Sequence, residues 1–320
     1  MKSGGISIFL AALLIAALGH SVRAAERVNV VRSGIDIAFA PIEVGREAHI
    51  WSDLGLDIEV LDVPGTRIEQ VLTSGDADVG LGAAVALGAR LKGVPTIGVA
   101  AIADRPYNFT LIVPVQSPIK TVADLRGRSV AVSTAGSLTE WMVRALSRQQ
   151  GWGQDGIKTV PLGGDEARIA ALRSGGGIDA DLSSLMQAVD LQDKGQARIL
   201  VYFGDVVKDF QNLVLKASDK FIAEHPDRLE RFLQGWYRTV VYMKTHPEEA
   251  TKVIAAAFRI NPAAVAKALP IEMKMMSEDG TFSAKGMEVV RQSLVELKIL
   301  PTLPAMSDLY TERFVPVKLK

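Results

Sequence analysis

The segment LTSGDADVGLG (residues 72–82) is echoed later in the chain by LRSGGGIDADLSS (residues 172–184). Each copy reads as the end of a helix that a glycine stops, a short strand that carries an aspartate, and a loop into another helix. Any two βαβ units share turn chemistry, so the echo alone does not establish a duplication. It predicts two α/β units of similar layout. Adding 101 to the residue numbers gives these matches: Gly55 on Gly156, Leu56 on Ile157, Arg67 on Arg168, Ile68 on Ile169, Val71 on Leu172, Gly75 on Gly176, Asp78 on Asp179 and Leu81 on Leu182.

Strand-like and helix-like segments alternate on both sides of each copy. This alternation predicts parallel sheets with helical crossovers. From about residue 218 the chain is rich in helix signals, including prolines at two expected first turns, Pro247 and Pro262. Asn261, before Pro262, and Ser283, upstream of MEVVRQSLVELKIL (287–300), are the candidate helix caps. The expected strands are RVNVVRSG (27–34), GLDIEVLDV (55–63), TIGVAAIA (96–103), SVAVS (129–133), IKTVPLG (157–163) and RILVYFG (198–204).

The N-terminus has the pattern of a secretory signal peptide. Lys2 precedes an apolar stretch at residues 6–18, and Val22-Arg23-Ala24 fits the rule of small residues at the cleavage site. We therefore predict cleavage after Ala24. The alternative is an uncleaved anchor, but the apolar stretch is shorter than the roughly 20 residues that span a bilayer. The chain has no Cys, so it can carry neither a disulfide nor a lipoprotein anchor, and we expect release into the periplasm.

Composition and motifs exclude several classes of function. The chain has 36 basic and 36 acidic residues, which leaves no electrostatic footprint for nucleic acid. The sequence lacks the G-x-S-x-G, H-E-x-x-H and Walker A motifs, and His49, His225 and His246 lack metal-ligand spacing. MKMM (273–276) indicates helix packing rather than copper binding. We therefore expect no enzyme activity, no metal and no cofactor.

Several segments together resemble one known family. They are GLDIEV (55–60), SGDADVGLG (74–82), SPIKTVADLRGRSVAV (117–132), STAGSLTEW (133–141) and SGGGIDADLSS (174–184). The chain resembles the periplasmic substrate-binding proteins of ABC importers for sulfonates, taurine and nitrate, over roughly residues 27–316. The same superfamily includes thiamine-pyrimidine synthases with a Cys-rich iron motif, which this Cys-free sequence lacks.

The resemblance implies the α/β, two-lobe type II periplasmic binding protein fold, with two parallel-sheet lobes joined by two crossover strands. Residues 25–110 and 212–320 would form lobe I, and residues 111–211 lobe II, after the signal peptide at 1–24. We expect the crossings near residues 103–117 and 202–215. Corresponding loops at the carboxyl ends of the strands would then face each other across one cleft, which closes by hinge motion.

The turn between the strand SVAVS and the next helix is the strongest candidate for ligand contact. Ser133, Gly136, Ser137 and Thr139 lie where exposed N–H groups and the helix dipole favour an anion. Plain N-capping by Ser137 is the alternative. In the second lobe, Asp181 and Ser183 could reach the cleft, with Asp181 favouring an amine or hydroxyl, although a solvated or capping aspartate explains it nearly as well.

In the first lobe, two loops are expected at the cleft. Gly82, Ala83 and Ala84 would contact a ligand through backbone N–H groups, unless they serve only tight packing. Ile37, Phe39 and Ala40 would form an apolar wall, with Phe39 as a core residue the alternative. Asp36 would repel an anion unless it points away or meets a ligand cation, and Arg105 is either an anion clamp or part of a hinge salt bridge.

We therefore expect a monomeric periplasmic protein that captures a small organic molecule, sulfonate-like or another anion, by hinge closure. It would deliver this molecule to the permease and ATPase subunits of an ABC importer. We expect it to bind no nucleic acid and, after cleavage, not to be embedded in the membrane. The alternative is an exported sensor that uses the same cleft to signal to a membrane receptor.

Overall fold

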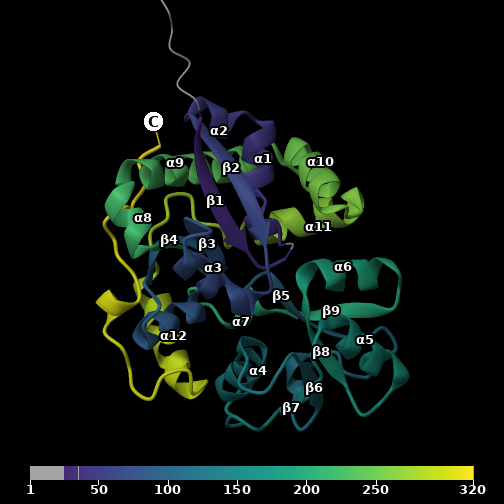
Figure 1. The fold of residues 1–320 in the computed structure, drawn as a ribbon. Coiled ribbons are helices and arrows are strands. Elements are labelled where there is room, and N and C mark those ends of the chain that lie inside the picture. Colours follow the sequence, from purple (N-terminus) through teal and green to yellow (C-terminus); the bar gives the residue numbers. More distant parts are fainter. Residues whose placement is uncertain (1–24, 35, 320) are drawn as a thin grey trace, which may run out of the picture.

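The computed structural model describes residues 25–34 and 36–319, so the expected signal peptide at 1–24 lies outside the described residues. Two five-stranded sheets divide the chain (Figure 1). The first has the order β2-β1-β3-β10-β4 and the second β7-β6-β8-β5-β9. The strands are β1 (Glu26–Arg32), β2 (Leu56–Asp62), β3 (Val79–Ala83), β4 (Thr96–Ala103), β5 (Phe109–Pro114), β6 (Ser129–Val132), β7 (Lys158–Pro161), β8 (Ala180–Ser184), β9 (Ala197–Tyr202) and β10 (Leu213–Ser218).

Both sheets are mixed, which corrects the prediction of purely parallel lobes. β1 runs parallel to β2 and β3, and β6 runs parallel to β7 and β8. In contrast, β10 is antiparallel to both β3 and β4, and β5 is antiparallel to both β8 and β9. β5 and β10 are the strands by which the chain enters each sheet from the other one. They arrive without a helical crossover, and such a crossover is what forces neighbouring strands to be parallel.

The chain passes between the sheets twice, between β4 and β5 and between β9 and β10. The two connections touch. Tyr107 of the first donates a hydrogen bond of 2.6 Å to Asp205 of the second. Gly204 lies flat against the Tyr107 ring, where an added Cβ would fall 2.4 Å from ring atoms. The two connections are thus joined to each other, and the pair of them is named the hinge. The exact lobe boundaries at 110/111 and 211/212 stay a proposal.

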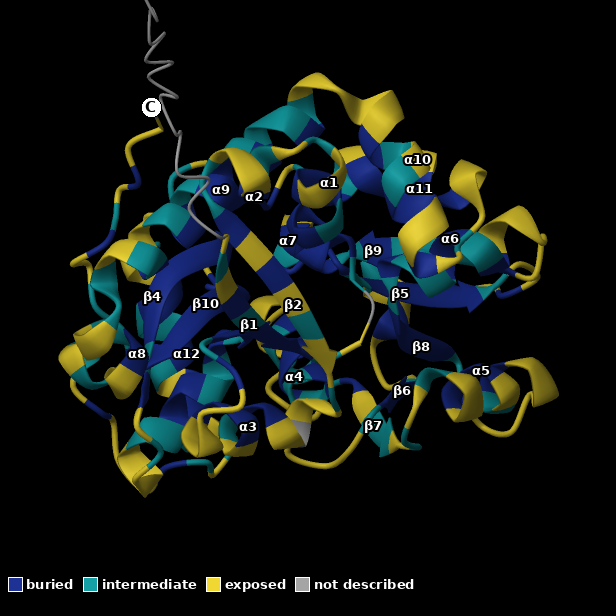
Figure 2. Cartoon of the chain, turned by 45° about the horizontal axis from the view of Figure 1, so that its top comes forward, coloured by how far each residue is buried: buried dark blue, intermediate teal, exposed yellow. Residues whose placement is uncertain are grey.

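The first sheet is covered by N-terminal and C-terminal helices together (Figures 1 and 2). In its core Trp51 stacks on Phe232, and Trp236 and Tyr237 are fully buried. Met275 and Met276 are buried in the same core, but they lie in the turn just beyond the helix that ends at Glu272, so MKMM packs in the core without being part of a helix. The helices on this side are α1 (Pro41–Glu47), α2 (Ile50–Asp53), α3 (Ile68–Ser74), α8 (Asp219–Glu224), α9 (Pro226–Thr245), α10 (Pro247–Phe258) and α11 (Pro262–Glu272).

The remaining helices pack on the second sheet or join the two halves. Trp141, from the second half, and Leu294, from the C-terminal helix α12, belong to one buried cluster. Asn261 and Ser283 cap α11 and α12 as the sequence indicates. The segment after β3, expected as an α-helix, forms a 3₁₀ helix, η3 (Ala84–Lys92). The other helices are α4 (Leu138–Gln149), α5 (Asp165–Ser174), α6 (Leu185–Asp193), α7 (Phe203–Val206) and α12 (Ala284–Glu296).

Within the described residues, no single helix is long and apolar enough to cross a membrane, although the bent pair α10 and α11 meets that test when taken together.

Candidate functional site

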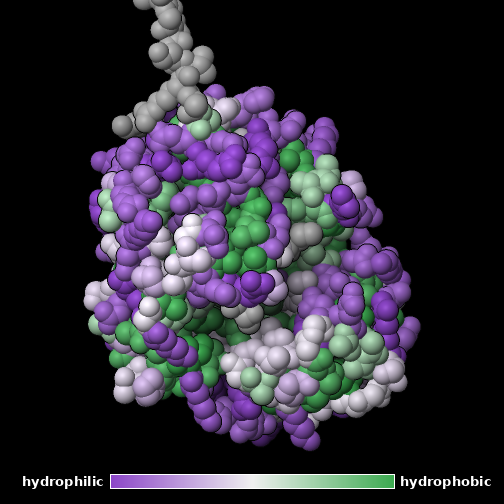
Figure 3. All heavy atoms as spheres, in the orientation of Figure 1, coloured by the Kyte–Doolittle hydropathy of each residue, from purple (hydrophilic) through white to green (hydrophobic). Residues whose placement is uncertain are grey.

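The candidate site is the hollow between the two sheets. Figure 3 shows the surface indented between the part built on the first sheet and the part built on the second, at lower right. The loops that follow β1 and β3, the turn that follows β6 and the loop that follows β8 stand at the carboxyl ends of their strands. In α/β sheets this edge is where ligands bind.

The repeated aspartates of the two halves are structural. Asp78 accepts a hydrogen bond of 2.8 Å from the backbone N–H of Asn29, and its own N–H donates to the carbonyl of Asn29. Asp179 makes the same two bonds with Ser129, with a side-chain distance of 2.9 Å. Each aspartate directly precedes its own strand, β3 or β8, and thus fixes the start of that strand against the neighbouring one, β1 or β6. The echo in the sequence encodes strand pairing rather than ligand contact.

The turn before α4 is satisfied by the protein's own groups. The N–H of Gly136 donates to the Glu140 carboxylate at 2.6 Å, and Ser137 caps the helix by accepting from the N–H of Glu140. Thr139 is hydrogen-bonded to both Ser133 and Ser137 at 2.9 Å. The structure therefore brings all four predicted residues together, but Glu140 occupies the place that an anionic ligand would take.

Hydrogen bonds hold Glu140 in its ionised form. The carboxylate also accepts from Thr159 at 2.9 Å and from Arg144 at 3.1 Å. Burial acts to raise its pKa, but these bonds and that from Gly136 outweigh burial and lower the pKa below its usual value. A ligand anion at this helix start would have to displace a firmly charged carboxylate.

Asp181 lies under α5 and does not reach solvent. Its side chain is fully buried and pairs with Arg168 at 2.8 Å. Burial raises the pKa of Asp181 to about 6, against the opposing charge of Arg168. Ser183, predicted beside it, is also fully buried, so neither side chain reaches the hollow. Its neighbour Ser184 caps α6.

The predicted residues of the first half are mostly enclosed. Ile37 and Ala40 lie in a buried cluster that also contains Leu185 of α6, so the two halves already touch there. Phe39 lies in the core of the first sheet and is 3% exposed. The direct ligand contacts proposed for these side chains therefore require the halves to separate.

The backbone of the loop after β3 is largely hydrogen-bonded within the protein, whereas the sequence analysis expected its N–H groups to contact a ligand. Gly82 and Ala83 pair with β10, opposite Val214 and Leu213, and the N–H of Ala84 donates to the carbonyl of Asn212 at 2.9 Å. Gly82 and Ala84 are buried and Ala83 is half-buried. The N–H of Ala84, which was predicted to contact a ligand, is therefore already hydrogen-bonded to the hinge.

A polar chain at the hinge was missed in the sequence. Asp36 accepts from the N–H of Ala38 at 2.8 Å and from the side-chain amide of Asn108 at 3.0 Å. Asn108 in turn accepts from Asn212 at 2.7 Å. The fully buried Glu272 of α11 completes the group beside Asp36. The signal available in the sequence was an asparagine directly before each crossing strand, Asn108 before β5 and Asn212 before β10.

Arg105 has a hinge role. Its guanidinium pairs with Asp104 at 3.2 Å, donates to the carbonyl of Lys274 at 2.7 Å and lies over the Tyr107 ring. These contacts support the hinge salt bridge, one of the two alternatives that the sequence left open.

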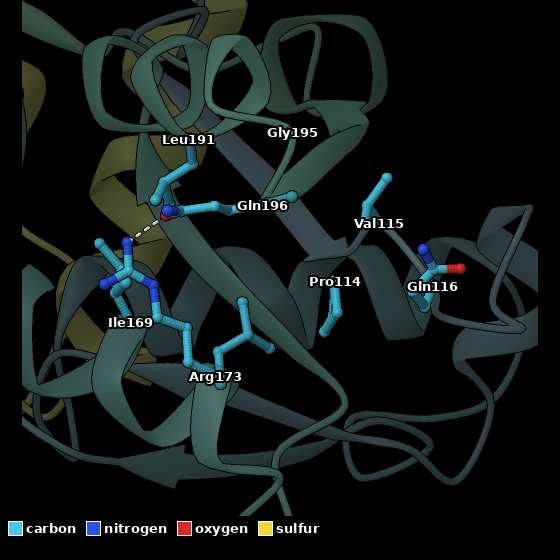
Figure 4. A pocket seen from close by; sticks show the side chains of 10 residues that line it. Pro114, Val115, Gln116, Ile169, Arg173, Leu191, Gly195 and Gln196 are labelled. Carbon is cyan, nitrogen blue, oxygen red and sulfur yellow. Dashed lines mark hydrogen bonds between the residues drawn. The ribbon is translucent and has the colours of Figure 1, made fainter.

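A pocket of about 820 Å³ is lined by residues of α9, α10 and α11 and lies away from the carboxyl ends of the strands. Two smaller ones lie on or beside the second sheet. A cavity of about 400 Å³ at the outer edge of the second sheet is lined mainly by apolar side chains, with Arg173 hydrogen-bonded to Gln196 at its rim (Figure 4). A second, of about 560 Å³, lies between α4 and the end of α12 and includes Gly136 and Glu140. There Glu296 accepts from Trp141 at 2.6 Å and from Arg148 at 3.0 Å, which ties α4 to α12.

Within residues 25–34 and 36–319, no group of three or more His, Asp or Glu side chains is arranged to hold a metal ion.

Comparison with known proteins identifies the family. Residues 36–250 match the profile described as NMT1/THI5 like, which is more than half of the chain. The chain belongs to the NMT1/THI5-like family. The fold also matches that of solved periplasmic binding proteins, so the predicted two-lobe type II fold is confirmed.

Two solved structures illustrate the fold. The periplasmic aliphatic sulphonate binding protein SsuA from Escherichia coli has a TM-score of 0.75 and 18% identity, over 92% of this chain and 94% of that one. The alkanesulfonate-binding protein SsuA from Xanthomonas axonopodis pv. citri, bound to MOPS, has a TM-score of 0.69 and 18% identity, over 90% of this chain and 99% of that one.

The curated relatives correct one expectation. The chain is 26% identical over 223 residues to 4-amino-5-hydroxymethyl-2-methylpyrimidine phosphate synthase of Candida albicans (strain WO-1), and 20% identical over 225 residues to the synthase of the same name from Aspergillus parasiticus. The matched region is 66% of this chain and about 65% of the length of these relatives. The prediction that the chain is not an enzyme is contradicted, because both relatives are named as one. Missing motifs excluded only the reactions that those motifs serve.

Proposed function

We propose that the NMT1/THI5-like chain binds a small organic molecule in the hollow between its two halves and delivers it, as a periplasmic monomer, to an ABC permease and its ATPase. The observation that supports this best is the joined hinge. The chain crosses twice between the sheets, and loops from both sheets stand at the same hollow. Binding of a ligand there would favour the closed arrangement of the halves by its contacts to both.

The test is ligand-induced compaction. Small-angle scattering and tryptophan fluorescence of the purified protein would be recorded with alkanesulfonates, taurine, nitrate, carboxylates, amidines and aminopyrimidines. We expect at least one compound to reduce the radius of gyration and to bind with one-to-one stoichiometry. No compaction with any of these compounds would overturn the proposal. N-terminal sequencing of the exported protein would test cleavage after Ala24.

A second candidate is catalysis in the same hollow. The curated relatives, named as a pyrimidine phosphate synthase, favour it. The two candidates predict different fates for a bound molecule. Mass spectrometry after long incubation would recover the compound unchanged from a binding protein and altered from an enzyme.

A further inference from the structure

One pocket lies at the end of the second half that faces away from the hollow. It has a volume of about 400 Å³ and is lined by the C-terminal parts of β5, α5 and α6 and by the start of β9; we name it the α5–α6 pocket. β5 runs antiparallel to β8, so the end of β5 at Pro114 lies beside the start of β8, whereas the hollow lies at the carboxyl end of β8. A molecule held in the α5–α6 pocket would therefore not compete for the hollow.

Apolar side chains form the floor of the α5–α6 pocket. Ile169 and Leu172 of α5, Leu191 of α6 and Ala197 of β9 are each at most 5% exposed and belong to one buried cluster on the second sheet. At the rim, Val115 is 40% exposed, so the apolar surface continues from the core out to solvent. Pockets of roughly 300–1,000 Å³ with mostly apolar walls and a few polar groups are the usual form of a small-molecule site.

The polar groups of the pocket are few, and one of them is charged. Arg173 is the single charged residue among those that line it, together with the amides of Gln116 and Gln196. Figure 4 shows Arg173 reaching from α5 to Gln196, to which it donates a hydrogen bond.

Arg173 has no carboxylate partner in the part of the chain that the structure describes. The other arginine of α5, Arg168, is paired with two carboxylates. A guanidinium has five N–H donors in a planar fork, so the bond to Gln196 leaves donors of Arg173 for a second partner.

Charge and shape limit what the pocket can hold. One guanidinium balances one negative charge, and a second charge on the same ligand would be desolvated without compensation. The fork of donors matches the two oxygens of a carboxylate. The apolar floor favours a ligand whose remaining surface is apolar, because its burial removes that surface and the floor from water.

We propose that the α5–α6 pocket is a second binding site, which takes a small monoanionic carboxylate with an aromatic or branched aliphatic body. The carboxylate pairs with the guanidinium of Arg173, and the body covers Ile169, Leu172 and Leu191. This inference does not rest on the function proposed for the hollow. A molecule that binds only the folded protein in this way also raises its thermal stability.

Binding would be measured by titration calorimetry at pH 7 with three probes of similar size. Phenylacetate is a monoanionic carboxylate, phenylacetamide keeps its shape without the charge, and phenyl phosphate carries a second charge. We expect phenylacetate to bind with one-to-one stoichiometry and each of the other two to bind at least tenfold more weakly.

Variants of Arg173 test the assignment of the pocket. Arg173→Gln should weaken phenylacetate binding at least tenfold, and Arg173→Lys, which keeps the charge but not the fork, should weaken it by a smaller factor. Arg126→Gln is the matched control, because Arg126 is an exposed arginine of the same half that does not line the pocket. It should change the affinity less than twofold. Circular dichroism would establish that each variant is folded.

Two further readouts separate this pocket from the hollow. Saturating phenylacetate should raise the melting temperature of the wild type and of Arg126→Gln but not of Arg173→Gln, and it should leave the radius of gyration unchanged. The inference is overturned if phenylacetate does not bind, if phenylacetamide binds equally well, or if Arg173→Gln binds phenylacetate as tightly as the wild type. Each of these results leaves the function proposed for the hollow intact, because that function is tested by ligand-induced compaction.

Discussion

The two halves of the chain use the same backbone plan and different buried charges. Asp78 and Asp179 make identical bonds to the neighbouring strand. Two residues after Asp179, however, the second half places the buried Asp181, where the first half has Gly80. Opposite Gly80, β10 supplies a buried lysine, Lys216, which pairs with Glu69 of α3. Residues that match between the two halves thus hold neighbouring strands together, whereas residues that differ place different buried charges in each half.

The largest loss of stability is expected at the buried Arg168–Asp181 pair of the second half. Arg168→Leu would leave Asp181 buried without its counter-ion, so we expect a loss of about 3–5 kcal/mol in the free energy of unfolding. The matched variant is Arg67→Leu, since Arg67 aligns with Arg168 but is exposed. It should change stability by less than about 0.5 kcal/mol. Urea denaturation measures both, and equal losses would show that the halves do not differ in this way.

The second half should contribute a pH dependence of stability through Asp181. Asp181 has a folded pKa of about 6, above the ordinary value near 4, because it is buried. The native state then binds more protons than the unfolded state between these values. Stability from this group is therefore full below about pH 4 and falls, by about 3 kcal/mol at most, as pH rises through 6. Asp181→Asn should flatten that part of the profile, measured as unfolding free energy against pH. A profile with the wild-type slope in this variant would contradict the assignment.

Asp78 and Asp179 occupy matching positions, so their removal should have similar effects on stability in the two halves. Asp78→Ala and Asp179→Ala each remove one charged hydrogen bond to a strand N–H, so each should cost about 1.5–3 kcal/mol. Since the two sites lie in different sheets, the double variant should show the sum of the two losses. Thermal and urea unfolding would reveal whether the costs are alike. A large cost at one site and none at the other would mean that the repeated phrase has two different roles.

The smallest change in stability is expected at Ser184 and Ala83, the residues that precede the helices after β8 and β3. Ser184 aligns with Ala83, and each precedes a helix, but only Ser184 has a side-chain bond to the helix start. Ser184→Ala should cost about 1 kcal/mol. Ala83→Ser, the reverse exchange, should be neutral or slightly stabilising. Chemical denaturation of the two variants distinguishes these outcomes, and a destabilising Ala83→Ser would show that η3 cannot accept a cap.

Local features could be predicted from the sequence because neighbouring residues alone decide them. Ser137, Asn261 and Ser283 were predicted as caps, and each accepts from an N–H of its own helix. The turn from Ser133 to Thr139 was predicted as one cluster and is one. Its occupation by Glu140 was not foreseen, since nothing in the spacing says that this side chain folds back onto Gly136.

The candidate site was harder to predict, because its key contacts join distant parts of the chain. Asp36 was recognised as awkward for an anion, yet its neighbours Asn108, Asn212 and Glu272 come from three other segments. Likewise, Asp181 was predicted to reach the cleft, with a solvated or capping aspartate explaining it nearly as well. Only the packing of α5 over β8 turned it into the buried partner of Arg168.

The sequence by itself determined the repeated α/β layout, the glycine stops and the helix caps, because these depend on backbone sterics and on hydrogen bonds between near neighbours. The tertiary structure alone decided that each sheet is mixed, which charges are buried in pairs, and that Arg173 is the single charged residue lining the α5–α6 pocket. The physical reason is that burial and Coulomb interaction depend on which segments meet in space, and strands β5 and β10 set those meetings by crossing from one sheet to the other.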